Sequence, residues 1–120
     1  MDKVVAVFGA SENPARYSYK ATKMLQRYGY EPLLDSKGPG VVDGLVIQTN
    51  VEEGTRVDTA TLYVAPHNQP AIEDQVLKLC PRRVIFNPGT ENPGFEARLQ
   101  KAGVQVVEAC TLVMLSTRQF

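Results

Sequence analysis

The sequence predicts an α/β protein: an open, mostly parallel sheet of about five strands with helices on both faces, in three layers. Three observations predict it. Apolar runs of strand length alternate with segments in which apolar residues recur at helical spacing. Glycine and proline stand between many of these segments, where they mark the ends of elements. A length of 120 residues with 43% apolar content is enough to fill one hydrophobic core.

The first half of the chain predicts a strand, a helix and a second strand. Residues 4–8 are all apolar and form the first strand. Residues 19–28 form a helix, because four apolar side chains recur on one face and a glycine follows them. Residues 30–34 form the second strand, and Pro32 places it at a sheet edge or gives it an irregular end, since proline donates no amide hydrogen. Residues 35–58 are expected to be loops with one short strand or turn.

The second half continues the alternation. Residues 59–64 form a strand, and a helix begins near residues 68–70. That helix carries an apolar face that ends at Cys80, which we expect in the core, and Pro81 closes it. Residues 83–86 form the next strand.

The last elements have well-marked boundaries. Asn92 and Pro93 have the chemistry of a helix start, and this helix ends before Gly103. Residues 104–107 supply the last strand, and residues 110–115 form a short helix or an extended tail. Right-handed crossovers between such strands give a Rossmann-like sheet, and we expect residues 1–120 to form a single domain.

Composition excludes several classes of protein. Lys plus Arg equals Asp plus Glu at 13 each, so the broad basic surface that binds nucleic acid or an anionic membrane is not expected. The amino terminus does not resemble a signal peptide, and no apolar run approaches the roughly 20 residues of a membrane helix. We therefore expect a cytoplasmic protein with reduced cysteines and no metal site. A homodimer is compatible with the exposed sheet edges of this fold.

Residues suited to binding follow the first, third and fourth of the long strands. In parallel sheets, ligands bind beyond the carboxyl ends of the strands, where the strand order reverses. These ends are residues 9–14, 65–68 and 87–91, all rich in Gly, Pro, Asn and hydroxyl side chains. Gly9 permits close approach of backbone to a ligand, and the amides of its loop and of the helix start can receive a phosphate.

The same region leaves the identity of a nucleotide open. The complete G-x-G-x-x-G pattern of dinucleotide folds is absent, because Ser11 and Pro14 occupy its later positions. Asp35, however, stands where such folds carry the acid that binds ribose hydroxyls, so NAD is the alternative ligand. Arg16, Lys20 and Lys37 are available to meet phosphate charge. The lone histidine, His67, has no nucleophile-elbow pattern behind it, so we expect no catalytic triad.

Four segments carry a resemblance to a known family. Residues 5–19, 25–30, 57–66 and 86–91 resemble the small stand-alone CoA-binding domain proteins, which are similar to the amino-terminal domain of the α subunit of succinyl-CoA ligases. The resemblance covers nearly the whole chain in register.

This resemblance implies that the loop at Gly9 holds the phosphates of coenzyme A and that residues near Lys37 lie by the nucleotide. The ligand groove would run past Ala65 and Pro66 to Asn87 and Pro88. The full set of implied ligand contacts is Gly9, Ala10, Ser11, Asn13, Arg16, Ser18, Tyr19, Lys37, Ala65, Pro66, Asn87 and Pro88.

The chain departs from the family pattern after its second strand. The family usually has a Val-Asn-Pro-type sequence there, whereas this chain has Leu34-Asp35-Ser36-Lys37. An acid at this place repels a 3′-phosphate unless Lys37 or Arg16 compensates, and it favours free ribose hydroxyls. Ligase activity is not implied, because the ligase's other domains and its phosphohistidine segment have no counterpart here.

Three functions from different classes remain open. The first is a CoA or acyl-CoA binding module without catalytic machinery. The second is an NAD-type oxidoreductase or redox sensor, supported by Asp35 and opposed by the incomplete glycine pattern. The third is a regulatory interaction domain that has kept the fold without its ligand, since fold does not fix function.

Overall fold

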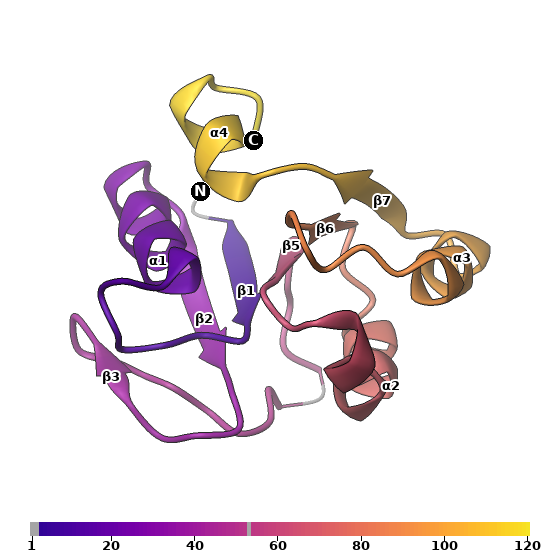
Figure 1. Cartoon of the computed structure of the whole chain (residues 1–120), viewed down its shortest axis with the longest axis horizontal. Helices are drawn as coiled ribbons and strands as arrows, with labels where there is room; N and C mark the ends of the chain where they lie inside the picture. The colour runs from indigo at the N-terminus through magenta and orange to yellow at the C-terminus, as the bar shows by residue number, and fades with distance from the viewer. Residues whose placement is uncertain (1–2, 53) are drawn as a thin grey trace.

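The protein contains a five-stranded parallel sheet, seen here in a computed structural model that describes residues 3–52 and 54–120. Met1, Asp2 and Glu53, the last within the stretch expected to be loops, lie outside the described residues. The strands stand in the order β2-β1-β5-β6-β7, and a small antiparallel pair, β3 and β4, is separate (Figure 1). The strands of the main sheet are β1 (Val4–Phe8), β2 (Glu31–Asp35), β5 (Thr59–Leu62), β6 (Arg83–Phe86) and β7 (Gln105–Glu108). The small pair is β3 (Val41–Val42) and β4 (Leu45–Val46).

Helices cover both faces of the sheet, as predicted. The α-helices are α1 (Tyr17–Arg27), α2 (Pro70–Leu79), α3 (Pro93–Lys101) and α4 (Thr111–Ser116), and a 3-10 turn, η1 (Pro66–Asn68), precedes α2. Figure 1 shows α1 and α4 on one side of the sheet and α2 and α3 on the other. Strand β1 serves both faces, because Val5 and Val7 pack toward α1 and α4 while Ala6 and Phe8 pack toward α2 and α3. The prediction of a three-layer Rossmann-like sheet is therefore confirmed.

Local signals in the sequence act as predicted. Pro32 lies in β2, an edge strand of the main sheet, where a missing amide hydrogen costs least. Asn92 caps α3 by accepting a hydrogen bond from the amide of Phe95 at 3.3 Å. Gly29 follows α1 with a φ of +89°, the left-handed conformation that favours glycine. Residues 110–115, left open between a helix and a tail, lie mostly in the helix α4.

The structure shifts several boundaries. Strand β2 runs one residue further than predicted, so Asp35 is its last residue and pairs with Phe8 of β1. Strand β5 ends two residues earlier than predicted, which puts Tyr63 and Val64 in the loop beyond the sheet. Both shifts move side chains to the carboxyl edge of the sheet.

One core assignment was wrong. Cys80 is exposed, not buried. It caps the end of α2 in a left-handed conformation with a φ of +47°, in the short connection between that helix and β6. The apolar face of α2 is complete without it, because Val76 and Leu79 are the buried residues of that helix. Within the described ranges, no helix is both long and apolar enough to cross a membrane.

Candidate functional site

The crevice of the sheet lies between β1 and β5. From β1 the chain goes to β2 on one side and then crosses to β5 on the other, so the direction of strand order reverses at this place. A ligand of an open parallel sheet binds beyond the carboxyl ends of the two strands that flank such a reversal. The ends of β1, β5 and β6 are neighbours, so the three segments singled out in the sequence meet at one edge.

Gly9 joins the end of β1 to the end of β2 and lies close against the loop that follows β5. Its φ is +87°, and a Cβ added to it would lie 2.6 Å from the carbonyl oxygen of Tyr63. Its amide donates a hydrogen bond to the backbone carbonyl of Asp35 at 2.9 Å, and the amide of Ala10 donates to the same oxygen at 3.0 Å. Glycine is therefore required for packing of the protein against itself, and these two amides are not free to bind phosphate.

The first of two cavities at this edge, which we name the Ser11 cavity, has a volume of about 490 Å³. It is lined by residues that follow β1, β2, β5 and β6: Gly9, Ala10, Ser11, Arg16, Tyr17, Ser18, Ser36, Tyr63, Ala65, Pro88, Gly89 and Thr90. The amino-terminal end of α1 faces it. Over the described residues, the amides of residues 17–19 make no hydrogen bond, so the free N–H groups and the positive end of the helix dipole are at the cavity.

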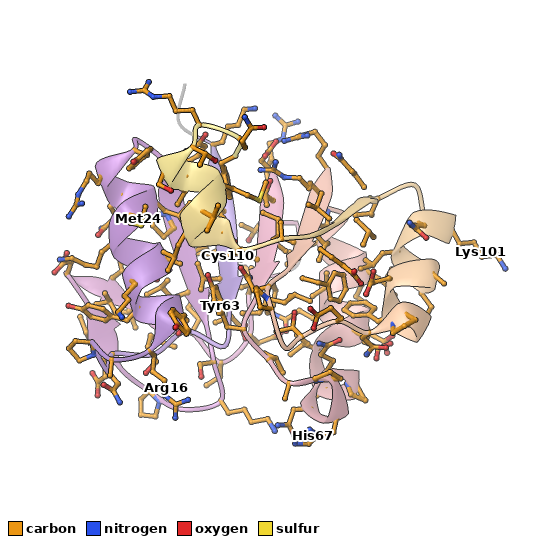
Figure 2. All side chains as sticks on the ribbon, turned by 45° about the horizontal axis from the view of Figure 1, so that its top comes forward. Arg16, Met24, Tyr63, His67, Lys101 and Cys110 are labelled. Carbon is orange, nitrogen blue, oxygen red and sulfur yellow. The ribbon has the colours of Figure 1, made fainter. Side chains whose placement is uncertain are left out.

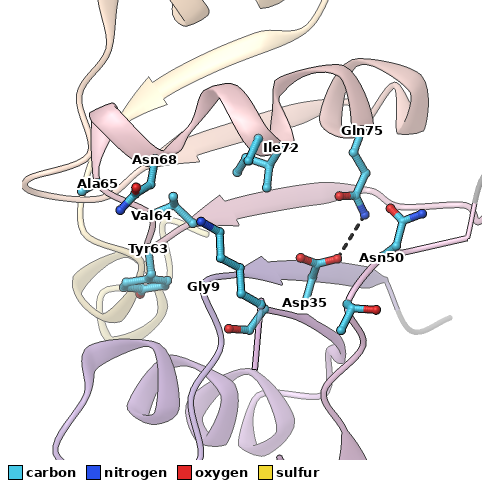
Figure 3. Close-up of a pocket in the computed structure, with 13 residues that line it drawn as sticks. Gly9, Asp35, Asn50, Tyr63, Val64, Ala65, Asn68, Ile72 and Gln75 are labelled. Carbon is cyan, nitrogen blue, oxygen red and sulfur yellow. Dashed lines mark hydrogen bonds between the residues drawn. The ribbon is translucent and has the colours of Figure 1, made fainter. Parts of the chain in front are cut away.

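The second cavity, which we name the Asp35 cavity, has a volume of about 360 Å³ and lies between β2 and α2 (Figure 3). Its lining residues are Gly9, Asp35, Ser36, Lys37, Thr49, Asn50, Tyr63, Val64, Ala65, Asn68, Ala71, Ile72 and Gln75. The two cavities share Gly9, Ser36, Tyr63 and Ala65, so they adjoin across the end of β1. Both volumes fall in the usual range for small-molecule sites, about 300–1,000 Å³.

Asp35 is the buried charge of the site. Its carboxylate oxygen Oδ2 accepts a hydrogen bond from the amide of Val51 at 3.1 Å and another from Nε2 of Gln75 at 3.0 Å (Figure 3). Only 4% of the residue is exposed, and this burial raises the pKa of the Asp35 carboxyl above its usual value, against the two hydrogen bonds, which lower it.

Tyr63 forms a wall common to both cavities. Its hydroxyl is fully buried and, across the residues that the structure describes, has no hydrogen-bond partner. Burial raises the pKa of Tyr63 to about 12, so the phenol is neutral at physiological pH. Figure 2 shows Tyr63 inside the molecule, whereas Arg16 and His67 lie at its periphery. His67 is exposed and lines neither cavity.

Eight of the twelve residues expected to bind ligand line these cavities. They are Gly9, Ala10, Ser11, Arg16, Ser18, Lys37, Ala65 and Pro88.

The other four line neither cavity and have other contacts. Asn13 accepts a hydrogen bond from the amide of Ala15 within the loop after β1. Tyr19 packs against the core on the α1 face, and Pro66 begins the turn η1. Asn87 is buried and uses its side-chain amide inside the protein: Nδ2 donates to Thr61 and to the backbone of β5, and Oδ1 accepts from the amide of Thr111.

Sequence reasoning missed the contribution of α2. Ile72 and Gln75 project from α2 toward the Asp35 cavity, beside Asn68, which belongs to the segment 65–68 that the sequence had indicated (Figure 3). The available signal was a polar side chain, Gln75, beside the apolar face of a predicted helix. This signal does not predict which residue the side chain of Gln75 contacts, because its partner Asp35 is 40 positions away along the chain.

Solved structures with the same fold span the chain almost completely. A crystal structure described as that of an uncharacterized protein is 40% identical with a TM-score of 0.96, and the match covers 100% of this chain and 99% of that one. A Thermus thermophilus protein is 27% identical with a TM-score of 0.87, covering 99% of this chain and 91% of that one.

A larger protein contains the same fold as a part. The dinucleotide-forming acetyl-coenzyme A synthetase 1 of Candidatus Korarchaeum cryptofilum is 17% identical with a TM-score of 0.72. The match covers 89% of this chain but 26% of the synthetase chain, and at this identity it shows the fold alone.

A search of curated proteins found no match. The comparison with family models shows which family the chain belongs to. The model of the family described as "CoA binding domain" matches residues 3–116, which include every element of the main sheet and both cavities. The chain therefore belongs to the CoA-binding domain family.

Proposed function

We propose that the protein binds coenzyme A or an acyl-CoA across the carboxyl edge of its sheet and does so without catalysing a reaction. The observation that carries the proposal is the pair of adjoining cavities with the free amides of the first turn of α1 at one of them. Membership of the CoA-binding domain family supports the choice of ligand.

The two cavities suit different parts of the ligand. The Asp35 cavity has apolar groups from Val64, Ala71 and Ile72, which suit the adenine ring, and a carboxylate that suits a ribose. The Ser11 cavity has the positive end of α1 and Arg16, which suit the pyrophosphate. The pantetheine arm then runs along the loop after β6, at Pro88.

Nothing in this arrangement supplies a nucleophile paired with a base. His67 is exposed and lines neither cavity, and the pKa of Tyr63 is too high for the phenol to act as a base at neutral pH. The proposed role is therefore recognition, in which the acyl group or a protein partner gives the binding its biological meaning.

Calorimetric titration of ligand-free protein with CoA, at one fixed salt concentration, tests the proposal. We expect one saturable site of micromolar or better affinity, and NAD as the paired ligand separates CoA binding from the dinucleotide alternative. Arg16→Gln is expected to weaken CoA about tenfold or more, since a charge-assisted hydrogen bond contributes about 1.5–3 kcal/mol.

The matched control is Arg27→Gln, which removes the same charge from an exposed position in the last turn of α1. Its affinity is expected to equal that of the wild type. Binding of NAD alone would transfer the function to the dinucleotide class, and binding of neither ligand would favour an interaction domain.

A further inference from the structure

The carboxylate of Asp35 is half satisfied by the protein. Both hydrogen bonds to it reach Oδ2, and both donors, the amide of Val51 and the side-chain amide of Gln75, are neutral. Throughout the described ranges, Oδ1 accepts no hydrogen bond. This oxygen is also not completely buried. Because Asp35 lines the cavity, this second oxygen is available to a donor on a ligand.

The surroundings of Asp35 do not neutralise its charge. Over residues 3–52 and 54–120, no Lys or Arg forms an ion pair with it. Lys37 lines the same cavity but is exposed, and Arg16 lines the Ser11 cavity and not this one. Burial raises the pKa of the Asp35 carboxyl, as expected for a carboxylate whose charge lacks a close cation.

The chemistry of this oxygen distinguishes two kinds of adenine nucleotide. A free ribose diol offers hydroxyl donors, which a carboxylate accepts well. A 3′-phosphate offers only acceptor oxygens and a charge of about −2 at neutral pH, which the carboxylate repels in a site shielded from water.

We propose that the Asp35 cavity selects an adenine nucleotide whose ribose hydroxyls are both free, so that the protein prefers the 3′-dephospho form of CoA to CoA itself. The inference rests on the proposed function, because it assumes that the adenosine end of the ligand occupies this cavity. Asp35 is then a specificity-determining residue: one oxygen is held by Val51 and Gln75, and the other receives a ribose hydroxyl.

Titration with CoA and with 3′-dephospho-CoA tests this selectivity, because the two differ only in the phosphate. For the wild-type protein we expect 3′-dephospho-CoA to bind at least about tenfold more tightly. In Asp35→Asn the repulsion is gone, so CoA should bind more tightly than it does to the wild type and the ratio should fall toward one. Asp74→Asn is the control, because Asp74 is an exposed aspartate on α2 that lines neither cavity.

Each other outcome overturns a defined claim. Equal or tighter binding of CoA by the wild type, or a ratio unchanged in Asp35→Asn, overturns the selectivity and leaves the proposed function in place. Binding of neither compound overturns both. A third titration with NAD, which has the free diol but no pantetheine arm, separates recognition of the diol alone from recognition of a dephosphorylated CoA. The wild-type ratio by itself decides the claim if the variant does not fold.

Discussion

Gly9 and Gly29 have nearly the same backbone conformation and very different surroundings. Their φ values are +87° and +89°. Beside Gly9, an added Cβ would meet the backbone of Tyr63 at 2.6 Å, whereas nothing lies within 4 Å of the corresponding place at Gly29. The pair therefore separates the cost of a left-handed conformation from the cost of a steric clash.

Alanine at these two positions is expected to destabilise the protein unequally. Gly29→Ala should lower the free energy of unfolding by about 1–2 kcal/mol, the usual cost of a left-handed conformation for an L-residue. Gly9→Ala should lower it distinctly more, because the Tyr63 carbonyl must also move. Urea unfolding of the three proteins measures the difference. Equal losses would mean that the backbone at Tyr63 yields freely. Because of this clash, a bulky residue at position 9 changes stability together with any effect on binding.

Several elements meet at the side chain of Asn87. It lies just beyond β6, and its Nδ2 donates to Oγ1 of Thr61 at 2.7 Å and to the carbonyl of Leu62 at 2.8 Å, both in β5. Its Oδ1 accepts the amide of Thr111, the first residue of α4, at 2.9 Å. The hydroxyls of Thr61 and Thr111 share a further hydrogen bond of 2.8 Å. This buried network fixes α4 to the sheet.

Asn87→Ala should remove this attachment. The substitution takes a hydrogen-bond partner from the carbonyl of Leu62 and from the amide of Thr111. Each buried polar group left unpaired in this way costs about 1–3 kcal/mol. We expect a loss of about 2–4 kcal/mol in the free energy of unfolding, measured by urea denaturation. Asn50→Ala, at an exposed position, is the control and should change stability by less than about 0.5 kcal/mol. A loss at Asn87 as small as the control's would contradict the structural role.

At the scale of the whole molecule, two aspartates couple stability to pH in opposite directions. The pKa of Asp35 is raised, mainly by burial, so its charge disfavours the folded state. The pKa of Asp58 is lowered, mainly by hydrogen bonds from Arg82, so its charge favours the folded state. Above the pKa of both groups Asp35 destabilises the fold and Asp58 stabilises it. Both effects vanish in acid.

The two asparagine variants should therefore shift the melting temperature in opposite directions. At neutral pH, Asp35→Asn should melt higher than the wild type, and the difference should shrink as the pH falls through the raised folded-state pKa toward the unfolded value of about 3.9. Asp58→Asn should melt lower at neutral pH, and its difference should disappear as the pH falls from about 3.9 through the lowered folded-state pKa. Melting curves between neutral and acidic pH measure both, and differences that stay constant with pH would contradict the assigned causes. A destabilising charge kept at Asp35 fits a residue that serves binding.

Local patterns were sufficient for the elements of the main sheet and its helices and for the edge of the sheet that carries the cavities, but they predicted one short strand or turn within residues 35–58, where the structure has the paired strands β3 and β4. The apolar run of residues 4–8, the capping residue Asn92 and the edge proline Pro32 act through near neighbours in the chain or through a general rule of sheets. The resemblance to CoA-binding domains follows from short segments of sequence and agrees with the family match.

The sequence by itself therefore determined the order of strands and helices, the crossover fold and the loop after β1 as a place for a ligand. Only the tertiary structure decided what each polar side chain meets. Asn87 turned inward to hold α4, Cys80 turned outward where α2 ends, and Gln75 reached Asp35 across the Asp35 cavity. The physical reason is that a helix or strand follows from spacing along the chain, whereas a hydrogen bond between residues 40 positions apart exists only after packing has brought their elements together.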